Sequence, residues 1–249
     1  MFDTILNHRT IRKYSTDPIP DEILNYILEA GTRASTTGNM QLYSIIVTTD
    51  ETIREELSPC HFNQPMVKEA PVVLTFCADF NRFNKWCRLR KAEPGYDNFL
   101  SFVTAAIDAL LVAQNVCVAA EDAGLGICYL GTTTYMAGKI IEILDLPGGV
   151  VPITTVTVGY PDEQPELTDR LPLEAVIHRE KYTDYSDQAI DNHYREKESI
   201  KSYQEFVKEN KRETLAQVFT DVRYKKSDNI LFSNSLLNVL EEQGFMNHQ

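Results

Sequence analysis

Residues 99–123 read FLSFVTAAIDALLVAQNVCVAAEDA, and this stretch says most about the fold. Its length and composition predict one long helix whose apolar side chains point in nearly every direction around the axis. A helix of this kind must be covered on all sides, either by the core of its own chain or by a second copy. We therefore expect a central helix, and we favour a homodimer.

Shorter elements surround this helix. Apolar and β-branched runs predict four strands at 44–48, 72–78, 127–130 and 153–158. Capping residues and helical periodicity predict helices at 2–6, 21–31, 51–57, 136–144 and 233–243. We expect residues 1–182 to form the core and residues 183–249 to form a charged, mostly helical extension that packs on the core or on a partner subunit.

The charge of the chain limits its partners. Its 249 residues include 24 Lys and Arg against 36 Asp and Glu, so the formal net charge is -12. A field of this sign repels phosphate-bearing polymers, and we expect no nucleic-acid partner. The longest apolar stretch, near Ala109 to Ala120, is interrupted by Gln114 and Asn115, so we expect no membrane partner either.

The cysteines indicate the compartment. They are five in number, widely spaced and without a C-x-x-C pair, at Cys60, Cys77, Cys87, Cys117 and Cys128. This pattern favours free thiols in a reducing environment, and we expect a cytoplasmic protein.

Within this acidic chain, residues 8–13 form a basic cluster, His8-Arg9-Thr10-Ile11-Arg12-Lys13. We expect it to occupy one helical turn and its edge, where Arg9 and Arg12 would share a face. Arginine forks suit a terminal phosphate dianion, and Arg170 in a later polar loop could close the same pocket. The alternative is a basic turn that only faces solvent.

Other motifs are weaker. Gly124-x-Gly126 follows a predicted helix and precedes a strand, which is the reverse of a dinucleotide-binding turn, so we interpret Gly124 as the end of a helix. The histidines lack metal-ligand spacing, and no nucleophile with an adjacent base is evident. We expect no metal site and no catalytic acid–base pair.

The basic cluster together with Tyr14 resembles the opening His-Arg-Ser-x-Arg-x-Phe/Tyr signature of the FMN-dependent nitroreductase and flavin reductase family. Other segments follow in the family's order: Gly38-Asn39-Met40-Gln41, Gln64 with the run ending Cys77-Ala78-Asp79-Phe80-Asn81-Arg82, Gly126 to Gly131, Gly159-Tyr160-Pro161 and Arg170-Leu171-Pro172. The end of the chain, with Gln243-Gly244-Phe245, is similar to the larger oxygen-insensitive NADPH nitroreductase subgroup.

This resemblance implies an α+β sandwich with a mixed, mainly antiparallel sheet, in a homodimer with one FMN at each interface. It implies that the phosphate and ribityl end of FMN is held by His8, Arg9, Thr10, Arg12 and Arg170. It also implies that Gln64 hydrogen-bonds the isoalloxazine edge and that a face of the ring lies on Tyr129, Leu130 and Gly131. It further implies contacts from the polar loop, across the dimer interface, by Ser35, Thr36, Thr37 and Gln41.

The implied activity is transfer of hydride from NADPH or NADH through FMN to nitroaromatics, quinones, azo compounds or free flavin. Lys211-Arg212 resembles the pair that grips the 2′-phosphate of NADPH in the subgroup; a solvated helix face is the alternative. The chain departs from the family where Thr168 replaces a lysine. Two other functions stay open: a flavin reductase that supplies a partner, and a flavin-binding sensor that docks through residues 187–226.

Overall fold

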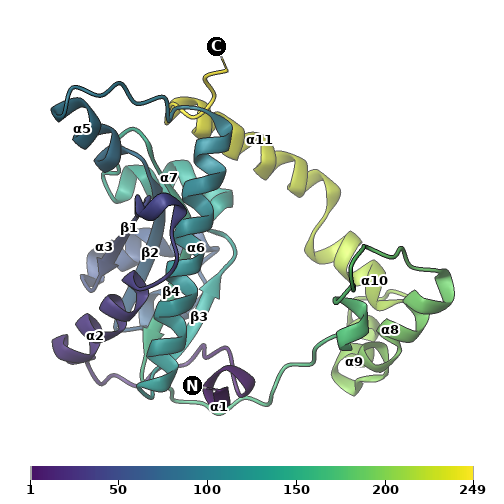
Figure 1. Cartoon of the computed structure of the whole chain (residues 1–249). Helices are drawn as coiled ribbons and strands as arrows, with labels where there is room; N and C mark the ends of the chain where they lie inside the picture. Colours follow the sequence, from purple (N-terminus) through teal and green to yellow (C-terminus); the bar gives the residue numbers. More distant parts are fainter. Residues whose placement is uncertain (1, 249) are drawn as a thin grey trace. The chain divides into compact units, whose positions relative to one another are not determined.

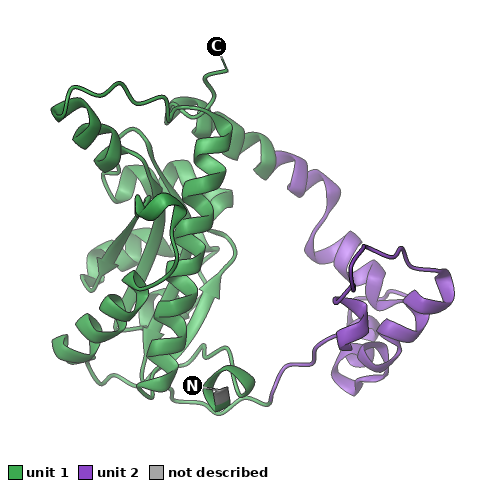
Figure 2. Ribbon diagram, viewed as in Figure 1, with its two compact units in different colours: residues 1–166, 232–249 green, residues 167–231 purple. Residues whose placement is uncertain are grey.

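The structure is a computed structural model that describes residues 2–248 of the chain. By their internal contacts these residues divide into two compact units, residues 1–166 with 232–249, and residues 167–231 (Figure 2). The boundary near residue 232 falls inside one helix. The internal contacts therefore divide the chain after residue 166 and before residue 232, and not at residue 182. The predicted FMN-binding core of residues 1–182 stays a prediction.

The first unit holds the only sheet among the described residues. Its elements in chain order are α1 (Phe2–Leu6), α2 (Asp21–Thr32), β1 (Tyr43–Thr48), α3 (Glu51–Leu57), α4 (Met66–Glu69), β2 (Val72–Asp79), α5 (Asn81–Leu89), α6 (Phe99–Asp122), β3 (Gly126–Leu130), α7 (Ala137–Ile143), β4 (Val150–Gly159) and most of α11 (Lys226–Glu242) (Figure 1). Short 3-10 turns lie at Thr37–Asn39, Ser58–His61 and Thr133–Met136.

The sheet has the strand order β1-β2-β4-β3, and all neighbouring strands are antiparallel. A single parallel bridge, Thr10 to Ile127, adds the N-terminal segment beside β3. The expected α+β fold with a mainly antiparallel sheet is therefore confirmed, with the parallel part reduced to that bridge. The two central strands are buried along almost their full length, as expected for strands covered on both faces.

The two faces of the sheet carry separate clusters of the core. On one face, Leu74 and Phe76 pack with Val112 and Val116 of α6 and with Ile27 of α2. Successive side chains of a strand point to opposite faces of the sheet. On the second face, Cys128 and Leu130 of β3 therefore pack with the α3, α4 and α7 region. Figure 1 shows α6 running along the first face.

Helix α6 confirms the predicted long helix and is only partly covered. Its inner side, with Ala109, Val112 and Ala113, is fully buried. Its other side exposes 51% of Ile107, 46% of Leu110 and 45% of Leu111. Among the described helices, α6 alone is long and apolar enough to cross a membrane. The buried core helix of a soluble protein can have the same length and composition. The packing of α6 on the sheet identifies it as the core helix of this unit.

The second unit is helical. It contains a 3-10 turn (Leu173–Ala175), α8 (Asp187–Ser199), α9 (Lys201–Glu209), α10 (Leu215–Val218), a π-helical turn (Phe219–Arg223) and the start of α11. A capping box at Thr214 starts α10, where Thr214 accepts from the amide of Gln217 and the Gln217 side chain accepts in return. The predicted helical content of residues 187–226 is confirmed.

Candidate functional site

The basic segment lies beside β3. The amide of Ile11 donates to the carbonyl of Ile127 at 2.9 Å, next to the Thr10 bridge. A side chain at Gly126 would place its Cβ 2.7 Å from the side chain of Ile11, so glycine is required for this close approach. The N-terminal segment is therefore fixed to the strand that leads to Tyr129, Leu130 and Gly131.

The expected helical turn at His8–Lys13 is wrong. Helix α1 ends at Leu6, and the following residues form the bridge at Thr10 and a second bridge between Tyr14 and Pro161. Hydrogen bonds to the rim of the sheet replace the intrahelical ones, so the spacing of Arg9 and Arg12 does not place them on a helix face. Burial of Ile11 and Tyr14 in the core accounts for this extended path.

The side chains of the segment carry incompletely satisfied cationic groups. His8 Nδ1 lies 2.7 Å from Glu121 Oε1. Arg9 donates from Nη1 to the carbonyl of Asn7 at 2.9 Å, and its buried Nε has no hydrogen-bond partner among the described residues. Arg9 also lines a hollow of about 280 Å3 that reaches Gly126 and Pro161. A half-buried guanidinium with an unused donor is suited to an anion.

The backbone after Arg9 already binds an anionic group. Glu163 Oε1 accepts from the amides of Arg12 at 2.6 Å and Lys13 at 3.1 Å. This contact leaves the Arg12 side chain exposed. No local sequence pattern selects Glu163, because only the fold brings the loop after β4 beside the N-terminal segment.

The polar loop is organised by a residue that sequence reasoning missed. Asp108 of α6 is 1% exposed, and its carboxylate accepts from the amide of Thr37 at 2.9 Å and from that of Leu42 at 3.2 Å. Ser35, Thr37 and Gln41 are exposed, and Thr36 is half-buried. Asp108 is the one acidic residue in the largely apolar stretch 99–120, and this was the signal that could have revealed it.

Gln64 lies after a tight turn at the end of the Ser58–His61 3-10 helix. Its Nε2 donates to the carbonyl of His61 at 3.1 Å. The His61 ring is fully buried, and its Nδ1 lies 2.8 Å from Thr132 Oγ1. Thr132 directly follows Gly131, where a Cβ would meet no atom within 4 Å. The predicted isoalloxazine contacts at Gln64 and at Tyr129–Gly131 are thus linked through one histidine.

Arg170 lies in the second unit. Its exposed guanidinium donates from Nη1 to the carbonyls of Thr168 at 3.2 Å and Asp169 at 2.9 Å. The neighbouring Asp169 carboxylate is 2.7 Å from Lys197 Nζ and accepts from the Tyr203 hydroxyl at 2.8 Å. Both oxygens of Asp169 are therefore engaged away from Arg170, whose positive charge stays available. Its predicted role with the basic segment stays a prediction.

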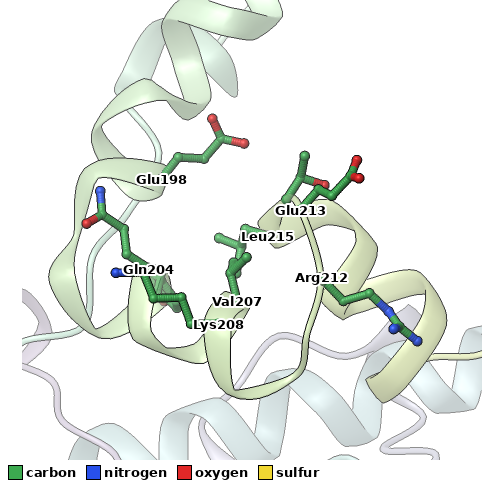
Figure 3. Close-up of a pocket in the computed structure, with 9 residues that line it drawn as sticks. Glu198, Gln204, Val207, Lys208, Arg212, Glu213 and Leu215 are labelled. Carbon is green, nitrogen blue, oxygen red and sulfur yellow. The ribbon is translucent and has the colours of Figure 1, made fainter.

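Lys211 and Arg212 lie after α9, and Arg212 lines a hollow of about 410 Å3. Its lining includes the apolar Val207 and Leu215, the cationic Lys208, and the acidic Glu198 and Glu213 (Figure 3). Arg212 Nε is 3.4 Å from Asp221 Oδ2, and Figure 3 shows the Arg212 side chain directed away from Leu215. The assignment of Lys211 and Arg212 to the 2′-phosphate of NADPH stays a prediction.

The cysteines are unsuited to nucleophilic chemistry. All five are buried and free. Burial raises the pKa of Cys77 and of Cys117 to about 12, so both thiols are protonated near neutral pH. Among residues 2–248 no group of three or more His, Cys, Asp or Glu side chains is placed to hold a metal ion.

The comparison that decides the family covers residues 5–160, which match the profile of the Nitroreductase family. The chain belongs to the nitroreductase family. It is 34% identical over 207 residues to an FMN reductase (NADPH) from Bacillus subtilis, covering 78% of this chain and 83% of that protein. Like other nitroreductases of this kind, it is an NAD(P)H-dependent flavin oxidoreductase whose cofactor is FMN.

Solved structures of oxidoreductases extend the similarity to nearly the whole chain. A candidate oxidoreductase from Bacteroides fragilis has 60% identity and a TM-score of 0.97 over 98% of this chain and all of that one. An NADPH:FMN oxidoreductase from Vibrio harveyi, solved in complex with NAD+, has 30% identity and a TM-score of 0.76 over 94% of this chain and 96% of that one. The resemblance inferred from the basic cluster is thereby confirmed.

Proposed function

We propose that this nitroreductase transfers hydride from NADPH or NADH to small acceptors such as nitroaromatics, quinones, azo compounds or free flavin, in two successive half-reactions. The proposal depends on one observation above all, the partly buried Arg9 with its unsatisfied Nε in a cationic segment bound to β3. A mononucleotide phosphate is the simplest anion that would use this donor set.

The residues present fit FMN. We propose that its phosphate and ribityl end is held by His8, Arg9, Thr10, Arg12 and Arg170. The open space at Gly131 allows a flat ring to approach the backbone closely, with Gln64 at the ring edge. Tyr129 and Leu130 continue this surface, while Ser35, Thr36, Thr37 and Gln41 are proposed to contribute from the loop.

When bound, FMN supplies the two-electron chemistry at N5 of its ring. The chain therefore has to bind, orient and exclude water, and it needs no acid–base pair. Burial of the His61 imidazole lowers its pKa to about 4 and keeps it neutral at physiological pH. Donor and acceptor would use the same face of the site in turn, which gives ping-pong kinetics.

We propose a homodimer in the cytoplasm. The exposed apolar side of α6, with Ile107, Leu110 and Leu111, is the surface that a second copy would cover. The five buried free thiols fit a reducing compartment.

Introducing charge on this surface tests the dimer. We expect Ile107→Glu with Leu111→Glu to convert a dimer into a monomer in light scattering after size-exclusion chromatography, because two carboxylates would be desolvated in each half of the interface. Leu89→Lys, at a position that is 75% exposed on α5, is the matched control and should stay dimeric. A wild-type chain that elutes as a monomer at micromolar concentration would disprove this assignment.

The enzymatic proposal is tested with purified protein reconstituted with FMN under anaerobic conditions. We expect NADPH or NADH to bleach the yellow colour and a nitroaromatic or quinone to restore it. Exchange of FMN with the medium during turnover would favour the flavin reductase that supplies a partner. A yellow protein that neither nucleotide bleaches would instead indicate a flavin-binding sensor, and would refute the oxidoreductase proposal.

A further inference from the structure

His61 is the most deeply buried titratable side chain near the proposed flavin ring. Its residue is 0% exposed, and its ring contacts one polar partner, the hydroxyl of Thr132 at 2.8 Å from Nδ1. Its other nitrogen, Nε2, is buried without a hydrogen-bond partner among the described residues. A buried ring with one unsatisfied nitrogen calls for an explanation beyond packing.

The protonation of the ring follows from this geometry. A proton on Nδ1 would be donated to Thr132 Oγ1 and would leave Nε2 as a bare lone pair, whereas the other tautomer would bury an unpaired N–H. Burial lowers the pKa of His61 to about 4, so the ring is neutral at physiological pH. In the favoured tautomer the Thr132 hydroxyl accepts from His61 and keeps its own proton to donate.

The main chain of His61 holds Gln64 in place. Its carbonyl accepts from the Gln64 amide at 3.2 Å and from Gln64 Nε2 at 3.1 Å. The two intervening residues, Phe62 and Asn63, have left-handed backbones with φ of 56° and 54°. Asparagine tolerates this conformation, but it is unfavourable for an aromatic residue such as Phe62, so this turn needs support from its surroundings. The anchored ring of His61 supplies that support.

We propose that His61 is a positioning residue that sets both protein contacts to the flavin ring, Gln64 through its carbonyl and the Gly131–Thr132 turn through its imidazole. This inference rests on the proposed FMN site. With Nε2 of Gln64 engaged by His61, the Oε1 atom of Gln64 is free to accept from a ring N–H. The Thr132 hydroxyl is free to donate to a ring acceptor beside Gly131. One residue thus fixes one acceptor through its main-chain carbonyl and one donor through its imidazole.

The test compares His61→Leu, which fills the space without hydrogen bonds, with His61→Asn, whose amide nitrogen can replace Nδ1. Thr132→Val and Thr132→Ser form the matched pair on the other side of the bond. Each protein is titrated with FMN and with riboflavin, and the visible absorption spectrum of the bound flavin is recorded. Because the contacts are to the ring, loss of the hydrogen bond should weaken both ligands equally, by about tenfold.

We expect His61→Leu and Thr132→Val to lose affinity for FMN and for riboflavin by the same factor, and to shift the flavin spectrum. The affinities of His61→Asn and Thr132→Ser should stay within about threefold of the wild type. The double variant His61→Leu with Thr132→Val should lose no more affinity than His61→Leu alone, because both substitutions remove the same hydrogen bond. Unchanged affinities and spectra in Thr132→Val, the half-buried and more readily folded variant, would overturn the proposal. So would a lower melting temperature with normal flavin binding. Failure of the wild type to bind FMN would overturn the proposed function as well.

Discussion

Alanine at Arg12 or Arg170 is expected to raise the Kd for FMN while leaving the Kd for riboflavin unchanged. Each substitution would remove one charge-assisted hydrogen bond from a guanidinium to the phosphate. Such a bond is worth about 1.5–3 kcal/mol, or roughly ten- to a hundredfold in Kd. Riboflavin lacks the phosphate, so its affinity reports only contacts to the ring and the ribityl chain. Titrations of the apoprotein by flavin fluorescence measure both constants.

The matched control is Arg88→Ala, which removes an exposed cation from α5. It should leave both constants unchanged if the effect is local and not due to net charge. Since Thr168 replaces the family's lysine, Arg170 is the one cation of its loop, Thr168–Arg170. An equal loss of FMN and riboflavin affinity in Arg12→Ala or Arg170→Ala would contradict the phosphate assignment.

Removal of the Asp108 carboxylate should be the most destabilising of the substitutions considered. Asp108→Ala leaves the buried amide of Leu42 and the amide of Thr37 without their acceptor. We expect the free energy of unfolding to fall by about 3 kcal/mol, because three hydrogen bonds to the Asp108 side chain are lost in a buried place. Urea denaturation of the apoprotein measures this change.

Glu55→Ala, at an exposed position on α3, is the control for loss of a negative charge and should change the unfolding free energy by less than about 0.5 kcal/mol. Asp108→Asn retains one acceptor oxygen and should be intermediate. If Asp108→Ala were as stable as the Glu55 control, the carboxylate would not be what holds the 37–42 loop.

Much of the fold followed from hydrophobic periodicity. The long helix at 99–123, the four strands and the helix at 51–57 all lie within three residues of their predicted ends. The strands and the long helix have long apolar runs, which are a strong local signal. Helix α5 was not predicted, because its sequence is mostly polar and the helix begins directly after a buried strand.

The site was harder to predict because it depends on contacts distant in sequence. The basic segment was selected correctly as cationic, but its predicted helix ignored the pairing of Thr10 and Ile11 with β3, which no local pattern reveals. Asp108 and His61 were missed for the same reason. Their partners lie 66 to 71 residues away in the sequence, so their role appears only once the chain is folded.

Kinetic competence of the bound FMN tests the central claim most directly. In an anaerobic stopped-flow experiment, NADPH or NADH is mixed with the FMN-loaded protein, and the rate of bleaching is compared with steady-state turnover on a quinone. The account predicts bleaching at least as fast as turnover with the better nucleotide. Bleaching that is absent, or slower than turnover with both nucleotides, would contradict it.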